Sequence, residues 1–213
     1  MKLRALGLLL LFGGLLSAAP ISVKLVDTGT PTVKDSSGYS VGPYDLLFQG
    51  QSIQALCVDP LHTSSIGSSW NVNVTALSSV KSGDQTYLHD QALYAGAAYL
   101  YNLLLQGNTD RKNIQDAVWV LMDPSFKNDL NSADKNSTFY SYLNAAQNPT
   151  NYTPFESLSD FYILSDTSSR NKNQEFLLYN PSQNSATPEP VTLAMFGISF
   201  ILGAAGIRFA KKR

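Results

Sequence analysis

Residues 88–106 read LHDQALYAGAAYLYNLLLQ, and few of these positions are polar. Leu93, Ala97, Leu100 and Leu104 recur at helical spacing, and other apolar side chains fill the positions between them. The pattern predicts a helix that is hydrophobic nearly all round, and such a helix has to be buried inside a domain. Asn102 interrupts the apolar part, which is too short to cross a bilayer.

Further helices are predicted after this one, with strands on both sides of the helical region. Asp110 can cap a second helix, which ends at Asp123 because the residue before a proline avoids helical angles. A third, weaker helix is expected over residues 137–147. The expected strands are Val23 to Val26, Tyr44 to Phe48, Ile53 to Val58, Asn71 to Leu77, Asp160 to Ser165 and Glu175 to Tyr179. Strands at both ends of a helical middle predict an α+β fold with one core.

The composition excludes several classes of protein. The chain has 213 residues, of which 44% are hydrophobic and 15% charged, so one or at most two folded domains are expected. Residues 20–187 hold nine Lys or Arg against fifteen Asp or Glu, and this acidic middle makes nucleic acid a poor partner. A single cysteine excludes an internal disulfide. We find no phosphate-binding loop, dinucleotide motif or metalloprotease motif, and predict neither a cofactor nor an enzyme.

The two ends of the chain have the features of targeting segments. Residues 1–19 combine a basic start, a short apolar core and small residues, which is typical of a secretory signal peptide. At the other end a Pro-Glu-Pro sequence precedes an uncharged run at 191–207, which predicts a short transmembrane helix with its basic end in the cytoplasm. The residues of this C-terminal signal are Pro188, Glu189, Pro190, Arg208, Lys211, Lys212 and Arg213.

These C-terminal features together resemble the PEP-CTERM sorting signal. The resemblance implies a bacterial protein whose tail is removed by an exosortase, a membrane cysteine transpeptidase, in a cell that makes exopolysaccharide. The expected organisation is a signal peptide (1–19), an exported domain (20–180), a linker (181–187) and a sorting signal (188–213). The expected partners are signal peptidase, exosortase and the inner membrane before processing. The mature protein would reach the cell surface, outer envelope or extracellular matrix.

The sequence context of Cys57 and Gln115 makes both of them candidate functional residues. Exported proteins usually pair their cysteines or avoid them, so a lone cysteine is unusual there, although a free cysteine is often only a small buried hydrophobe. Gln115 shares a helix face with Trp119 and Met122, at the shoulder of the apolar stripe formed by Ile114, Ala117, Val118 and Leu121. The Gln115 side chain is therefore expected to contact another buried element of the fold. A structural hydrogen bond would also explain a glutamine at this position.

A strand cysteine followed by Gln-x-Ala-x-Trp in a later helix resembles bacterial surface thioester domains. The resemblance implies that Cys57 supplies the sulfur and Gln115 the acyl carbon of an internal thioester, with Ala117 and Trp119 packed beside it. Such a bond would attach the protein covalently to an amine or hydroxyl on a target surface. The sequence departs from the family motif at Ile114, where that motif has threonine.

Three functions remain open at this stage, besides a carbohydrate-binding module in which some of the eleven Tyr and two Trp would supply stacking faces although most should be core. The first is a structural or adhesive envelope protein associated with exopolysaccharide. The second is a covalent adhesin that uses the Cys57–Gln115 thioester. The third is a secreted polysaccharide hydrolase, for which Asp59, Asp116 and Asp123 could supply paired carboxylates. His62 and His89 lie far apart in the sequence, and we expect both to be surface or satisfied core residues.

Overall fold

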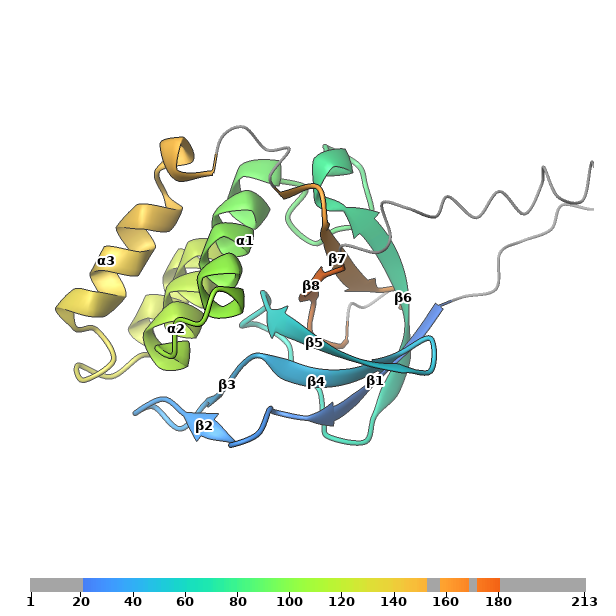
Figure 1. The fold of residues 1–213 in the computed structure, drawn as a ribbon, viewed down its shortest axis with the longest axis horizontal. Helices are drawn as coiled ribbons and strands as arrows, with labels where there is room; N and C mark the ends of the chain where they lie inside the picture. The colour runs from blue at the N-terminus through green and yellow to red at the C-terminus, as the bar shows by residue number, and fades with distance from the viewer. Residues whose placement is uncertain (1–20, 153–157, 169–171, 181–213) are drawn as a thin grey trace, which may run out of the picture.

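The computed structural model describes residues 21–152, 158–168 and 172–180. Six strands form a closed antiparallel barrel in the order β1-β4-β5-β8-β7-β6, and three helices lie beside it (Figure 1). A short hairpin of β2 and β3 contacts α2. The strands are β1 (Ile21–Asp27), β2 (Val33–Lys34), β3 (Ser40–Val41), β4 (Tyr44–Phe48), β5 (Gln51–Cys57), β6 (Ser69–Ala76), β7 (Phe161–Asp166) and β8 (Phe176–Tyr179). The helices are α1 (Gln91–Leu105), α2 (Arg111–Met122) and α3 (Ser137–Ala146), with single 3-10 turns at Leu77–Ser79, Pro124–Asn128 and Pro149–Asn151.

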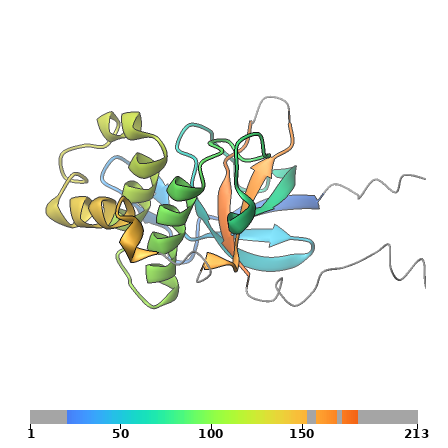
Figure 2. The same ribbon diagram turned by 90° about the horizontal axis from the view of Figure 1, so that it is seen from above.

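The barrel strands follow the alternation that a half-buried sheet requires. In β4, Tyr44, Leu46 and Phe48 point inward and are buried, while the side chains between them are more exposed. The alternation breaks at the end of β5, where Ala55, Leu56 and Cys57 are all buried. Both faces of the strand are covered there because the helical layer packs against that end of the barrel, as the second view shows (Figure 2). The end of β5 therefore lies in the core between barrel and helices.

The helices begin where the sequence supplies caps. The Asp110 side chain accepts a hydrogen bond from the backbone N–H of Asn113 at the start of α2, and Asn136 caps α3 in the same way. Helix α1 is buried along most of its length, as its nearly all-round apolar pattern predicts. Gly96 lets α1 approach α3 closely, because a Cβ atom there would lie 2.5 Å from the Ala146 carbonyl oxygen.

The predicted α+β class is wrong. The strands from the two ends of the chain pair with each other, β5 with β8 and β6 with β7, and the pairing of β1 with β6 closes them into one barrel. Residue periodicity revealed the strands but carries no information on which strands pair. Within the described residues no helix has both the length and the apolar character needed to cross a membrane. The transmembrane helix expected at 191–207 lies outside the described residues, as do the signal peptide, the linker and the sorting signal.

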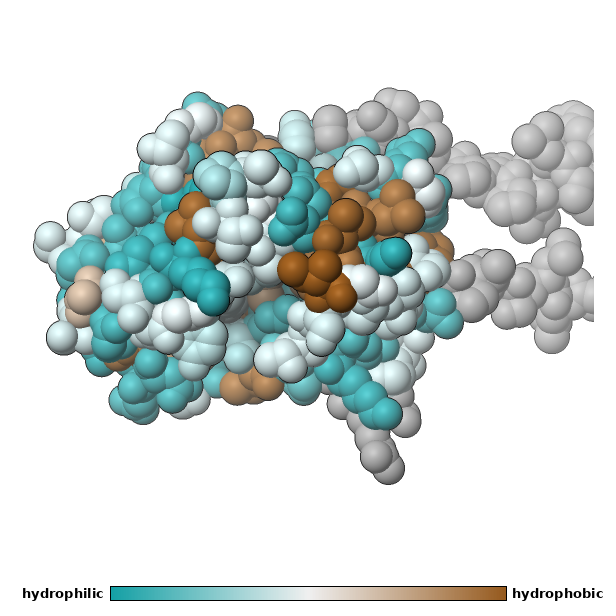
Figure 3. All heavy atoms as spheres, turned by 90° about the horizontal axis from the view of Figure 1, so that it is seen from below, coloured by the Kyte–Doolittle hydropathy of each residue, from teal (hydrophilic) through white to brown (hydrophobic). Residues whose placement is uncertain are grey.

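The surface of the folded domain is mostly polar. In Figure 3 the helical side of the visible face is largely hydrophilic, and the most hydrophobic patch lies toward the barrel side. Exposed large apolar side chains include Leu61 and Ile66, which follow β5 in the chain. Scattered apolar residues of this kind are normal on a solvated protein.

Candidate functional site

Helix α2 directs one polar side chain, Gln115, into the core between the helices and the barrel. The Gln115 residue is 0% exposed, yet both ends of its carboxamide have partners. Its Nε2 donates to the carbonyl oxygen of Cys57 at 2.7 Å, and its Oε1 accepts from the backbone N–H of Gly42 at 3.1 Å. The carboxamide carbon is thereby held between the end of β5 and the loop that precedes β4.

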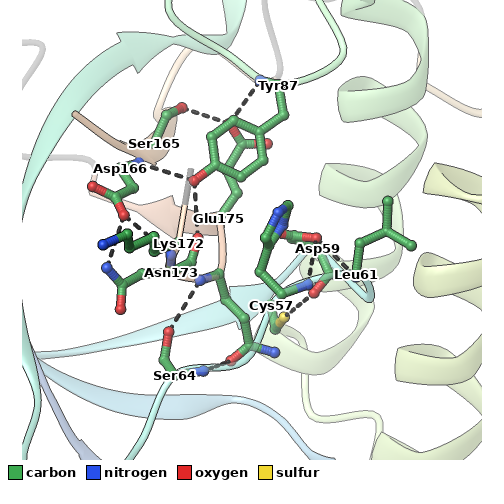
Figure 4. Close-up of polar contacts among 12 residues, drawn as sticks. Cys57, Asp59, Leu61, Ser64, Tyr87, Ser165, Asp166, Lys172, Asn173 and Glu175 are labelled. Carbon is green, nitrogen blue, oxygen red and sulfur yellow. Dashed lines mark hydrogen bonds and ion pairs between the residues drawn. The ribbon is translucent and has the colours of Figure 1, made fainter. Parts of the chain in front are cut away.

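Cys57 is the last residue of β5, where it pairs with Phe176 of β8. It is 0% exposed, and its Sγ donates to the carbonyl oxygen of Asp59 at 3.3 Å (Figure 4). Burial, with the Asp59 charge as a further contribution, raises the pKa of the thiol to about 12, while the Trp119 indole acts in the opposite direction. Cys57 is therefore a neutral thiol at physiological pH, and its own backbone carbonyl oxygen binds Gln115.

The Gly42 backbone is fixed by Arg111, the first residue of α2. The guanidinium donates to the carbonyl oxygens of Gly42 at 2.7 Å, Pro31 at 2.9 Å and Val41 at 3.1 Å. A Cβ atom on Gly42 would lie 2.9 Å from Gln115 Oε1 and 3.0 Å from the Tyr44 ring, so only glycine fits. Helix α2 thus carries both Gln115 and Arg111, and Arg111 fixes the backbone of Gly42, whose N–H binds Gln115.

Glu175 has a buried carboxylate, and this residue is hydrogen-bonded to the chain just after Cys57. Its carbonyl oxygen accepts from Val58 N–H, and its side chain accepts from the Tyr94 hydroxyl. The side chain also accepts from Ser165 Oγ and Tyr87 N–H (Figure 4). Burial raises the pKa of Glu175 to about 7, although these hydrogen bonds lower it. The network joins β5, β7, β8 and α1 at the barrel end that faces α2.

Asp116, the neighbour of Gln115, lies close to two other buried carboxylates. Its carboxylate oxygens lie within 4.8 Å of carboxylate oxygens of Asp35 and Asp134, and all three residues are buried. Burial, then the charges of Asp35 and Asp134, raises the pKa of Asp116 to about 8. Burial would also raise the pKa of Asp134, but hydrogen bonds from Lys112, whose Nζ lies 2.5 Å away, and from Ser37 lower it to about 2. Three carboxylates in this arrangement are the group of described side chains that could hold a cation.

A cleft of about 200 Å³ opens beside α2. Aromatic side chains form much of its wall, and three of them pack on each other: the centroid of the Phe126 ring lies 5.3 Å from both Tyr39 and Trp119. Tyr44, which neighbours Gln115 across Gly42, lines the same cleft. Since Tyr44 lies in both places, the cleft wall reaches the buried site.

The structure brings together the two residues of the candidate thioester, which are 58 positions apart in the sequence. Ala117 and Trp119 are buried on the same helix, and so is Ile114, which replaces the threonine of the family motif. The three candidate hydrolase carboxylates have separate surroundings: Asp59 binds His62, Asp116 faces Asp35, and Asp123 caps the turn at Ser125. Sequence reasoning missed Gly42 and Arg111, although a Gly-Pro step just before a strand marks a special backbone.

The chain matches no protein-family model and no curated protein. Among solved structures, it is similar to the N-terminal thioester domain of a surface protein from Clostridium perfringens. The TM-score is 0.41 with 14% sequence identity, and the match covers 74% of this chain and 97% of the other. A likeness at this level leaves the chemistry to be argued from the residues of this chain.

Proposed function

We propose that the protein forms an internal thioester between Cys57 Sγ and the side-chain carbonyl carbon of Gln115, and that it uses this bond for covalent attachment to a target surface. The supporting observation is the buried Gln115 carboxamide, held against Cys57 with both polar ends occupied. In the step that forms the bond, Sγ bonds to the carboxamide carbon and the bond from that carbon to Nε2 breaks. The thiol proton leaves with the nitrogen as ammonia.

The contacts of Gln115 suit this step. The Gly42 N–H lies on Oε1, where negative charge develops as sulfur attacks, and one such donor is worth about 10²–10³ in rate. The Cys57 carbonyl oxygen orients the nitrogen that departs. Because the pKa of the thiol is raised to about 12, Sγ still carries its proton when attack begins, and transfer of that proton to the leaving nitrogen has to accompany attack. The backbone of the barrel therefore supplies both the orientation and the charge stabilisation.

Burial explains how the bond would persist until a target arrives. Cys57 and Gln115 are 0% exposed, so bulk water has no direct access to the acyl carbon. Attack by an external amine or hydroxyl would release the Cys57 thiol and leave the target bonded to Gln115. The aromatic cleft beside Trp119 is the approach that we assign to the attacking group.

Intact-mass spectrometry of the purified protein tests this function. We expect a mass lower than the encoded one by one ammonia, and an adduct after treatment with methylamine. Cys57→Ala and Gln115→Ala should both keep their full encoded masses and form no adduct. A wild-type protein with its full encoded mass and a thiol that alkylates readily after mild unfolding would disprove the thioester.

We also propose that the chain is exported and sorted through its Pro-Glu-Pro signal, so that the thioester acts in the cell envelope or the extracellular matrix. The support is the sequence of residues 1–19 and the order of Pro188-Glu189-Pro190 and the terminal basic cluster. In the producing cell, Glu189→Ala should leave the C-terminal tail attached. Normal removal of the tail in this variant would contradict exosortase processing.

A further inference from the structure

The chain makes a locked turn directly after Cys57. One oxygen of Asp59 accepts hydrogen bonds from the backbone N–H groups of Leu61 at 2.9 Å and His62 at 3.3 Å (Figure 4). The other oxygen lies 2.7 Å from Nδ1 of the His62 ring. The Asp59 carbonyl oxygen meanwhile accepts from the Cys57 thiol. A histidine–carboxylate pair is therefore tied to the residue that would carry the thioester sulfur.

His62 is positioned by contacts from three parts of the fold. Besides Asp59, the Tyr87 ring packs edge-on against the imidazole, with 5.6 Å between the ring centroids. Two residues further on, Ser64 N–H donates to Gln174 Oε1 at 3.3 Å, and Ser64 Oγ accepts from Gln174 N–H at 3.0 Å. His62 lines the same aromatic cleft as Trp119 and Tyr44, and its side chain is 33% exposed. The imidazole is thus fixed in place yet reachable from the cleft.

A carboxylate on one ring nitrogen decides what the other can do. With Nδ1–H donated to Asp59, Nε2 carries the lone pair and can accept a proton. General-base help of this kind contributes about 10²–10⁴ in rate. It helps a hydroxyl most, because a hydroxyl is a weak nucleophile until it loses its proton, whereas a neutral amine attacks a thioester unaided. In the aromatic wall, Trp119 and Phe126 are buried behind Tyr39, whose 42% exposed ring offers an apolar face on which a sugar can lie.

We infer that His62 is the general base for opening of the thioester and that the acceptor is a carbohydrate hydroxyl. This inference rests on the proposed thioester. In the step, the hydroxyl oxygen bonds to the Gln115 acyl carbon while its proton passes to His62 Nε2. The bond from that carbon to Cys57 Sγ breaks, and the thiolate takes the proton back from the imidazolium. The product is an ester to the glycan and a free thiol, with Asp59 acting as a positioning residue.

The chain supplies a matched control, since its second histidine makes a similar pair. His89 Nδ1 lies 2.9 Å from Asp84 Oδ1, but this histidine is 43% exposed and does not line the aromatic cleft. His89→Gln removes an equivalent histidine–carboxylate contact without touching the proposed site. Any effect found for His62→Gln and not for His89→Gln is therefore due to the position of His62 in the cleft.

The test uses the full protein and two probes, glycerol as the hydroxyl and methylamine as the amine, with adduct formation followed by intact mass. His62→Gln should keep the thioester and its methylamine rate but form the glycerol ester about 10²-fold more slowly. His89→Gln should match the wild type with both probes. If His62→Gln does not fold, Asp59→Asn serves instead, because the amide oxygen can keep the turn. We expect Asp59→Asn to slow only the glycerol reaction, by about 10-fold.

Three results would overturn the inference while leaving the thioester intact. These are an unchanged glycerol rate in His62→Gln, equal slowing with both probes, and a wild-type protein that reacts with methylamine but not with glycerol. A wild-type protein without the ammonia loss would instead disprove the proposed function itself. The two failures are therefore distinguishable in one set of spectra.

Discussion

Gln115 and Asp116 are neighbours on α2 and equally buried, yet the surroundings of one side chain are neutral and those of the other are charged. The Gln115 carboxamide meets two neutral backbone groups, one from β5 and one from the loop before β4. The Asp116 carboxylate faces Asp35 and Asp134, and among the described residues neither of its oxygens has a conventional hydrogen-bond partner. Neutral partners hold Gln115 in the same way at every pH. The environment of Asp116 favours a bound proton, so this side of the helix makes stability depend on pH.

We expect the largest effect from Gly42→Ala, which changes the surroundings of Gln115. The added methyl would lie 2.9 Å from Gln115 Oε1 and 3.0 Å from the Tyr44 ring, so at least one of these side chains would have to shift. We expect the free energy of unfolding to fall by about 3 kcal/mol, the upper range for overpacking, and the ammonia loss to disappear. Urea unfolding and intact mass measure the two effects.

Gly38→Ala is the control for this substitution. Gly38 has a positive φ of 95° but no atom within 4 Å of a built Cβ, so alanine there should cost only the backbone strain of about 1 kcal/mol. The ammonia loss should remain. If Gly42→Ala behaved like Gly38→Ala in both measurements, the close contact between Gly42 and Gln115 would have no role.

A smaller effect is expected for Arg111→Lys. Arginine reaches four backbone carbonyls between Thr28 and Gly42, whereas a lysine ammonium can hold one geometry at a time. We expect unfolding to become easier by about 1.5 kcal/mol and thioester formation to become slower, because the Gly42 N–H loses its anchor. The half-time of ammonia loss during refolding measures this. An unchanged half-time would show that Gly42 is held without the guanidinium.

Local features of the sequence predicted much of the secondary structure. Asp110 caps α2 and the Asp123-Pro124 step ends it, as expected, and the strand Tyr44–Phe48 has the expected bounds. Each of these features depends on side chains that are neighbours in sequence. Closure of the barrel depends instead on pairs such as Ala55 with Leu178, which lie far apart in the chain. Hydrophobic alternation is the same in an open sheet and a closed barrel, so the fold class was predicted wrongly.

In the candidate site, too, some residues were predicted from the sequence and others were missed. Cys57 and Gln115 were paired because of a family resemblance, and the structure places them in contact, although formation of the thioester stays a prediction. Gly42 and Arg111 could not be found from local patterns, since one belongs to a turn and the other to the first turn of a helix. Their roles appear only when the β2–β3 hairpin is placed against α2. Asp35 and Asp134 were missed for the same reason, because Asp116 alone gives no sign of them.

Asp116→Asn addresses the other half of the comparison and should have the smallest effect, with the opposite sign. The pKa of Asp116 is raised to about 8, so the folded state keeps a proton that the unfolded chain releases above about pH 4. The contribution of Asp116 to wild-type stability is therefore greatest below about pH 4 and is lost as pH rises through 8. Asparagine cannot ionise, so it adds no negative charge beside Asp35 and Asp134. We expect the variant to be more stable than the wild type by about 1 kcal/mol at pH 8 and equal to it at pH 4.

Urea unfolding at several pH values would show this as a shallower decline of stability in Asp116→Asn. Part of the decline should remain, because the pKa of Glu175 is also raised, to about 7, and acts with the same sign. Asp134→Asn is the control: the pKa of Asp134 is lowered to about 2, so its carboxylate stabilises the fold above about pH 4, and its replacement should destabilise the protein at pH 8. If Asp116→Asn kept the full wild-type decline, Asp116 would be ionised in the folded state, and the contrast with Gln115 would rest on packing rather than on a proton.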